Sequence, residues 1–246
     1  MSAGSVKPTV VLVHGAFADA SSWEQVIQRL QAKGYAVEAP AIALRGVTVD
    51  TAYLSSVVKQ IQEPVLLVGH SYGGALISNV DAPNVVGLVF VAAFAPDTDE
   101  ALGDVTPDSK DSILSTALVQ RDYPTDSGGA TAPELFIDPA KLRAVFAADL
   151  PEERTSVMAS TQRPVAASAF GDRSGPPAWK SLPSWAVVAT KDKAAGADLV
   201  RSMARRAGAE ITEVDSSHVV MLSQPQAVTD VILRAAEAVQ HTSAVR

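Results

Sequence analysis

Residues 69–74 read Gly-His-Ser-Tyr-Gly-Gly and directly follow the apolar run Val-Leu-Leu-Val at 65–68. A serine between two glycines, just after a short buried strand, is typical of a nucleophile elbow, which is a very tight strand-to-helix turn. A side chain at Gly69 or Gly73 would collide with neighbouring backbone in such a turn. The stretch therefore predicts that Ser71 presents its hydroxyl at the end of a strand and acts as the nucleophile of a hydrolase.

Strand and helix patterns alternate along both ends of the chain. Apolar, β-branched runs predict strands at 9–13, 35–39, 65–68, 86–91, 185–189 and 210–214. Amphipathic or capped segments predict helices at 22–33, 49–61, from Ser71 onward, 197–207 and 225–240. Such alternation predicts an α/β fold built on a doubly wound, mostly parallel sheet.

The alternating pattern is interrupted between residues 97 and 182. This segment is richer in Asp, Pro, Ser and Thr, and no run typical of a strand occurs in it. Helical stripes are found at 112–119, 139–147 and 151–160. We therefore expect a helical insertion at 97–182 that separates two parts of one core, 1–96 and 183–246.

A serine nucleophile needs a base within hydrogen-bond reach, and the chain offers four histidines. His218 lies in a loop between the last predicted strand and the last predicted helix. In a parallel sheet that loop lies at the same edge as Ser71, so His218 is the expected base. His14 and His70 are interpreted as packing residues beneath the site, and His241 as a residue of the tail.

The histidine in turn needs an acid that fixes its tautomer. Asp192 follows the predicted strand at 185–189 and would lie at the same edge of the sheet. The chain order Ser71, Asp192, His218 is the order typical of a serine–acid–histidine triad on this kind of sheet. Asp97 is the main alternative, because it follows the strand at 86–91 at that edge.

Two backbone amides are expected to stabilise the oxyanion of the reaction. The loop His14-Gly15-Ala16-Phe17 follows the first strand, where one donor is expected, and the residue after the nucleophile supplies the other. We assign the amides of Ala16 and Tyr72, with Phe17 as the neighbouring alternative. The side chains of Phe17, Tyr72, Phe146 and Trp179 are candidates to line the substrate pocket; Phe136 and Phe170 are further aromatic candidates.

The composition excludes several classes of function. The 246 residues carry a formal charge of −7 and no basic cluster, so no nucleic-acid or anionic-membrane partner is expected. The chain has no cysteine, which excludes disulfides, thiol catalysis and cysteine metal sites. No run reaches the ~18 apolar residues of a membrane helix. Residues 1–8 hold no long apolar stretch, so no signal peptide is expected and a cytoplasmic location is the default.

Taken together, the chain resembles the α/β-hydrolase superfamily over nearly its whole length. The segments 14–17, 69–74, 190–193 and 217–218 look most like those of the small esterases related to plant methylesterases and hydroxynitrile lyases. The resemblance implies that the insertion around 146–170 is a helical cap that closes over the serine.

This chain differs from the hydroxynitrile lyases of that group at two positions, and both differences favour ester hydrolysis. Hydroxynitrile lyases of this group carry a lysine after the catalytic histidine and a threonine after the histidine that ends the first strand, where this chain has Val219 and Gly15. Dehalogenases and epoxide hydrolases place aspartate at the elbow, where this chain has Ser71. The region 190–196 lacks the Ile-Pro that usually follows the acid in this group and reads Ala194-Ala195-Gly196.

The expected function is therefore hydrolysis of a carboxylic ester of a small to medium, mainly apolar substrate through an acyl-enzyme. The expected partner is a small-molecule ester, and neither a metal nor an organic cofactor is expected. A cofactor-free lyase or peroxidase on the same triad, or a ligand receptor with low turnover, are the alternatives.

Overall fold

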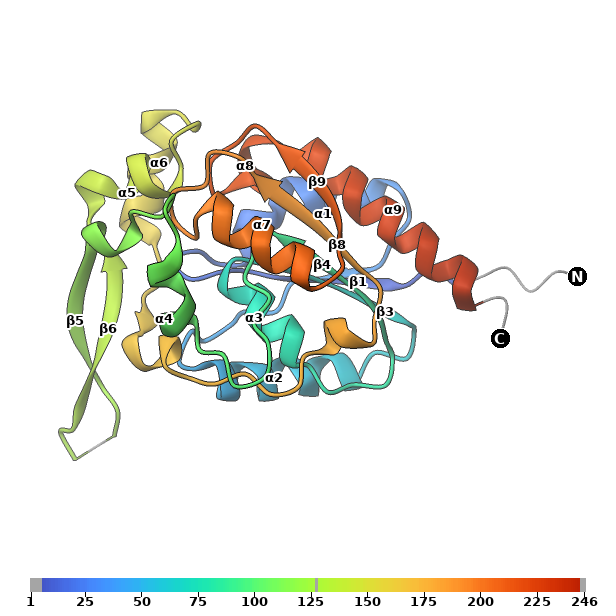
Figure 1. Ribbon diagram of the computed structural model, residues 1–246, viewed down its shortest axis with the longest axis horizontal. Helices are drawn as coiled ribbons and strands as arrows, with labels where there is room; N and C mark the ends of the chain where they lie inside the picture. The colour runs from blue at the N-terminus through green and yellow to red at the C-terminus, as the bar shows by residue number, and fades with distance from the viewer. Residues whose placement is uncertain (1–5, 127, 244–246) are drawn as a thin grey trace, which may run out of the picture.

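A six-stranded parallel sheet lies at the centre of the computed structural model (Figure 1). Its strands are β1 Thr9–Val13, β2 Val37–Glu38, β3 Val65–His70, β4 Val85–Val91, β8 Ser184–Ala189 and β9 Glu210–Val214. They lie in the order β2-β1-β3-β4-β8-β9, and every neighbouring pair is parallel. Every residue of β1 and β3 is buried, as expected for strands covered on both faces. The predicted fold class is confirmed.

The structure describes residues 6–126 and 128–243, with the side chains of 241–243 excepted. The expectation that residues 1–8 hold no signal peptide lies partly outside these residues, and the interpretation of His241 lies outside them. No helix in the described part of the chain is both long and apolar enough to cross a membrane.

Helices cover both faces of the sheet (Figure 1). One face carries α1 Glu24–Ala32, α8 Val220–Ser223 and α9 Pro225–Ser243, and the other carries α2 Val47–Lys59, α3 Tyr72–Asn79 and α7 Ala197–Arg206. Helical structure begins at Ala20, two residues before the predicted start of the first helix. The reason is Asp19, whose carboxylate accepts a hydrogen bond from the amide of Ser21 at 2.8 Å and caps a 3-10 helix, Ala20–Trp23, that leads into α1.

The elbow between β3 and α3 is as tight as the sequence predicts. Ser71 has φ 52° and ψ −119°, a strained conformation for a residue with a side chain. A Cβ atom on Gly69 would lie 2.6 Å from the carbonyl oxygen of Gly73, and one on Gly73 would lie 2.5 Å from that of Val13. The backbone of the elbow therefore packs directly against the end of β1, where only glycine fits.

The segment 97–182 contains strands as well as helices, and the prediction that it has none was wrong. Its strands β5 Leu118–Pro124, β6 Thr131–Ile137 and β7 Val165–Ala166 form a separate antiparallel sheet. Its helices are α4 Leu102–Val105, α5 Pro139–Phe146 and α6 Glu152–Thr161, with 3-10 helices Thr106–Asp108, Leu114–Ala117, Ala167–Phe170 and Ala178–Lys180. Figure 1 shows the β5–β6 hairpin at the margin of the molecule, away from the central sheet.

The helix predicted at 112–119 is replaced by tertiary contacts with the core. The amide of Ile113 donates to the carbonyl of Lys193 at 2.9 Å, and the hydroxyl of Ser112 donates to the carbonyl of Ala194 at 2.6 Å. These bonds hold residues 112 and 113 against the loop after β8. Only Leu114–Ala117 forms a 3-10 turn before β5 begins. The helices predicted at 139–147 and 151–160 are confirmed as α5 and α6.

The packing at Gly73 can be tested with Gly73→Ala. The added Cβ would overlap the carbonyl of Val13, and overpacking of this kind costs ~1–3 kcal/mol or more, so the melting temperature should fall by several degrees. Gly175→Ala is the matched control, because its Cβ would meet only Asn79 Oδ1, at 3.5 Å. Circular-dichroism melts compare the two. An unchanged melting temperature in Gly73→Ala would show that the elbow can accommodate a Cβ atom at this position.

Candidate active site

The backbone of Ser71 is held at the carboxyl edge of the sheet by three hydrogen bonds. Its amide donates to the carbonyl of Val91, at the end of β4, at 3.3 Å. Its carbonyl accepts from the amides of Gly74 at 2.9 Å and Phe94 at 3.2 Å. The residue is 7% exposed and borders a small cavity, so its backbone is fixed in place while its side chain lies at an enclosed space.

His218 and Asp192 form a buried hydrogen-bonded pair at the same edge. Nδ1 of His218 lies 2.7 Å from Oδ2 of Asp192, and each residue is 1% exposed. Because a carboxylate accepts, Nδ1 carries the proton and Nε2 is left with a free lone pair. Nε2 of His218 is thus the ring nitrogen that can take a proton from a nucleophile, and the ring borders the same cavity as Ser71.

The loop after Asp192 fixes the second oxygen of its carboxylate. Oδ1 accepts from the amides of Ala194 at 2.8 Å and Ala195 at 3.0 Å. The carboxylate of Asp192 is therefore held on both oxygens, by these two amides and by His218.

Asp97, the alternative acid, lies elsewhere. Its carboxylate pairs with the ammonium of Lys180, and this hydrogen bond lowers the pKa of Asp97. Its amide donates to Glu100 Oε2 at 2.9 Å. Asp97 has no contact with His218, so of the two candidates only Asp192 is placed to orient that ring.

The two other described histidines are buried and neutral. Nε2 of His14 accepts from the amide of Ile42 at 3.0 Å, and its Nδ1 donates to the carbonyl of Gly15 at 2.9 Å. Nε2 of His70 donates to the carbonyl of His218 at 3.1 Å, while its Nδ1 has no partner among the described residues. Burial lowers the pKa of His14 and, together with the His218 charge, places that of His70 well below its usual value. His14 and His70 therefore serve to hold neighbouring backbone segments through their hydrogen bonds.

The amides expected to bind the oxyanion differ in whether they are already used. The amide of Phe17 donates to the carbonyl of Arg163 at 3.1 Å. The amide of Tyr72 belongs to the first turn of α3 and has no partner within that helix. No acceptor in the described ranges 6–126 and 128–243 bonds the amide of Ala16. Ala16 and Tyr72 are therefore the free donors of the three.

The cavity above Ser71 is mainly apolar. Its lining comprises Ala16, Phe17, Ser71, Tyr72, Phe94, Thr106, Leu114, Phe146, Phe170, Ala194, Ala195 and His218. The Phe146 ring stands edge-on to Phe17, with centroids 6.2 Å apart, and 5.1 Å from the His218 ring. Four lining residues come from the segment 97–182 and the others from the core.

Trp179 does not line this cavity, so its assignment to the pocket was wrong. It is buried beside α3, where its indole N–H donates to the carbonyl of Pro96 at 3.1 Å. Phe136 also lies elsewhere, beneath the guanidinium of Arg121. Buried aromatic residues have the same composition signal in a core and in a pocket, so only the fold separates them.

Tyr72 has a second role that the sequence did not indicate. Its hydroxyl donates to Oδ2 of Asp50, on α2, at 2.9 Å. Burial raises the pKa of Asp50, and burial beside that carboxylate raises the pKa of Tyr72. The bond ties the residue after Ser71 to a helix that packs against α3.

A carboxylate of the inserted segment holds the loop of His218. Asp149 accepts from the amide of Ser217 at 3.0 Å and from the hydroxyl of Ser216 at 2.9 Å, and it also accepts from the Ser217 hydroxyl. Burial alone would raise the pKa of Asp149, but these hydrogen bonds outweigh it and lower the pKa. The sequence held no signal for this residue, because its partners lie in another part of the chain.

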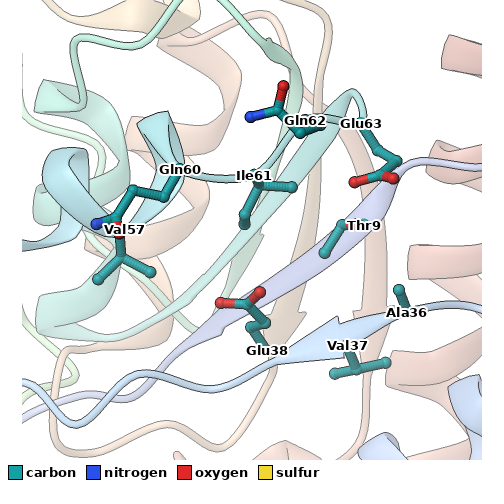
Figure 2. Close-up of a pocket in the computed structure, with 9 residues that line it drawn as sticks. All are labelled: Thr9, Ala36, Val37, Glu38, Val57, Gln60, Ile61, Gln62 and Glu63. Atoms are coloured by element: carbon teal, nitrogen blue, oxygen red, sulfur yellow. The ribbon is translucent and has the colours of Figure 1, made fainter.

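A larger hollow, of about 630 Å³, is remote from the site. Figure 2 shows the residues that line it. It lies where β1 begins, between Thr9, the short strand β2 and the turn at 60–63. Ser71 lies beyond the opposite ends of the strands. Size alone therefore does not identify the site, which is defined by the paired His218 and Asp192.

The comparison with known proteins agrees with this geometry. A model of the alpha/beta hydrolase family matches residues 10–231, and the chain belongs to this family. It is 35% identical to methylesterase 3 of Arabidopsis thaliana over 115 residues, which cover 40% of this chain and 44% of that protein. It is 26% identical to the alpha-hydroxynitrile lyase of Arabidopsis thaliana, over 89% of this chain and 93% of that one. The chain thus aligns with less than half of methylesterase 3 but with most of the lyase.

A solved structure extends the likeness to the whole fold. The polyneuridine aldehyde esterase structure matches with a TM-score of 0.78 and 20% identity, covering 94% of this chain and 100% of that one. At this identity the likeness concerns the fold. The resemblance inferred from the sequence is confirmed.

The contact of Asp149 can be tested with Asp149→Ala. The variant should lower kcat for whichever substrate is turned over, since the His218 loop loses three hydrogen bonds. Asp149→Asn, which keeps one acceptor oxygen, should restore part of kcat. Asp138→Ala, which removes a cap at the start of α5, is the control for a general loss of stability.

The stability of the same variants should depend on pH in a defined direction. The pKa of Asp149 is lower in the folded protein than its ordinary value of 3.8, so its stabilisation is present above that value and is lost as pH falls through the folded pKa. The difference in melting temperature between wild type and Asp149→Ala should therefore shrink on acidification below about pH 4. A difference that grows there would contradict this account.

Proposed function

We propose that this chain hydrolyses carboxylic esters of small to medium, mainly apolar substrates through an acyl-enzyme on Ser71. The observation that carries the proposal is the buried His218–Asp192 pair, whose free Nε2 belongs to a ring on the same cavity as the strained Ser71. This combination of a nucleophile, a base and an orienting acid is what acyl transfer requires.

In the proposed mechanism, Nε2 of His218 removes the proton of Ser71 as its oxygen attacks the ester carbonyl. The amides of Ala16 and Tyr72 donate to the resulting oxyanion; one donor of this kind is worth about 2.7–4 kcal/mol. His218 then gives its proton to the leaving alcohol. A water molecule, deprotonated by His218, attacks the acyl-enzyme; the bond to Ser71 breaks, His218 returns the proton to the Ser71 oxygen, and the carboxylic acid is released. Asp192 holds the ring and balances its charge throughout.

Two buried residues favour hydrolysis over a lyase reaction. Val219, which is fully buried, follows His218 at the position where the lyases that this chain resembles carry a lysine, so this position supplies no ammonium group. A Cβ on Gly15 would lie 2.8 Å from Cβ of Ser71, so a threonine would not fit there without moving the nucleophile. The identity is higher to methylesterase 3 of Arabidopsis thaliana, at 35% over 115 residues, than to the alpha-hydroxynitrile lyase, at 26% over 246 residues, although the lyase covers more of the chain.

We also propose that residues 97–182 act as a cap over a core formed by 1–96 and 183–246. The support is that Thr106, Leu114, Phe146 and Phe170 of this segment line the cavity opposite the core residues. The cap would exclude water from the site and select the substrate.

Ser71→Ala tests the mechanism. The variant should lose ester turnover, because the other two hydroxyl-bearing residues of the cavity are engaged: Tyr72 donates to Asp50 and Thr106 to the carbonyl of Leu102. A fluorophosphonate should no longer add its mass to this peptide. Ser78→Ala, on the same helix and facing the carbonyl of Gly74, is the matched control and should keep both activity and labelling. Mass spectrometry and a pH-stat assay measure the two outcomes. Full activity in Ser71→Ala would rule out the serine mechanism.

A further inference from the structure

The cavity above Ser71 is too small to hold an ester. It encloses about 20 Å³, close to the space that one water molecule needs. Pockets that bind small molecules usually enclose ~300–1,000 Å³. If the proposed function holds, the substrate must occupy space beyond this cavity, and the structure indicates where that space lies.

An outer pocket of about 340 Å³ lies directly beside the cavity. Thr106, Leu114 and Phe170 line both spaces and so form the wall between them. All three belong to the segment 97–182. The outer pocket continues along the start of β5 to Leu118 and across to Leu135 on β6.

The outer pocket is chemically neutral. No charged residue lines it, and Pro107, Leu118, Leu135 and Ala167 supply apolar surface. Its hydroxyls are largely engaged: those of Ser109 and Ser112 donate at 2.6 Å to Asp198 and to the carbonyl of Ala194, and that of Thr106 donates to the carbonyl of Leu102. A charged or strongly polar group would find few partners there, so the pocket suits an uncharged hydrocarbon chain or ring.

A second neighbouring hollow is smaller, shares fewer residues with the cavity and is lined by charged residues. It encloses about 190 Å³, and Phe17 alone is shared with the cavity. Its lining includes Asp19, Glu24 and Arg154, three charged residues. The outer pocket is therefore the better match for the apolar lining of the cavity itself.

We propose that the cavity and the outer pocket are two parts of one substrate site. One apolar arm of the ester lies in the outer pocket, and Phe170 and Leu114 move aside to admit it. Phe170 and Leu114 are only partly buried, and Phe170 ends a short 3-10 helix. Their side chains can therefore move without disturbing the central sheet. The substrate class is a neutral ester with one extended apolar arm.

The experiment fills the outer pocket and leaves the catalytic residues unchanged. Leu118→Trp places a larger side chain in the pocket. Val119→Trp is the matched control, because the next residue of a strand points to the opposite face and Val119 is 39% exposed. The substrates are methyl acetate, hexyl acetate and methyl heptanoate. The last two are isomers that carry the long arm on the alcohol and on the acyl side.

We expect Leu118→Trp to lower kcat/KM at least about tenfold for one of the two long isomers and to leave methyl acetate within about twofold of wild type. Val119→Trp should match wild type on all three. The isomer that is lost identifies the arm in the outer pocket. Unchanged values for both isomers, or an equal loss for all three esters, would overturn the proposal.

Binding provides a readout that is independent of turnover. Calorimetry on Ser71→Ala should show binding of the preferred isomer. The affinity should fall at least about tenfold in Ser71→Ala/Leu118→Trp and should be unchanged in Ser71→Ala/Val119→Trp. A wild type that hydrolyses none of the esters would refute the proposed function. The binding comparison would then still decide whether the outer pocket takes a neutral apolar ligand.

Discussion

The site depends on the close approach of three backbone segments with no side chains between them. Gly73 of α3 packs on the carbonyl of Val13, Gly15 packs on Ser71, and a Cβ on Gly74 would lie 2.3 Å from the carbonyl of Phe94. This contact joins the ends of β1, β3 and β4 at one edge of the sheet. It forces Ser71 into its strained conformation, and it sets the Ala16 loop and α3 on either side of the cavity.

Burial then separates the roles of three histidines that lie close together. The rings of His70 and His218 are 4.6 Å apart, and His14 follows the adjacent strand. Burial without a carboxylate partner lowers the pKa of His14 and His70, so neither gains a stable positive charge. His218 alone has Asp192 at hydrogen-bond distance. In the proposed mechanism the imidazole of His218 accepts and releases the proton, while His14 and His70 hydrogen-bond to the surrounding loops.

The sequence predicted the core and the paired residues because their signals are local. The apolar runs marked the strands, and their order placed Ser71, Asp192 and His218 at one edge. The inserted segment was harder, because most of β5 is exposed and polar and so leaves no apolar run. The sequence around Ile113 has a helical pattern, but the amide of Ile113 donates to a carbonyl of a distant loop and the predicted helix does not form. Whether an aromatic side chain such as Trp179 faces core or pocket depends on contacts between distant segments, which no local pattern records.

The hydrogen bond from the Phe17 amide to the carbonyl of Arg163 has a consequence for evolution of the enzyme. Phe17 adjoins Ala16, and Arg163 belongs to the inserted segment, which also carries Asp149 against the loop of His218. The inserted segment is thus hydrogen-bonded both to the loop of Phe17 and to the loop of His218. If this segment is the cap that we propose, changes that widen access by shifting it will also disturb those two loops. Under that proposal, breadth of substrate range and speed of turnover are not independent traits, and selection for one acts on the other.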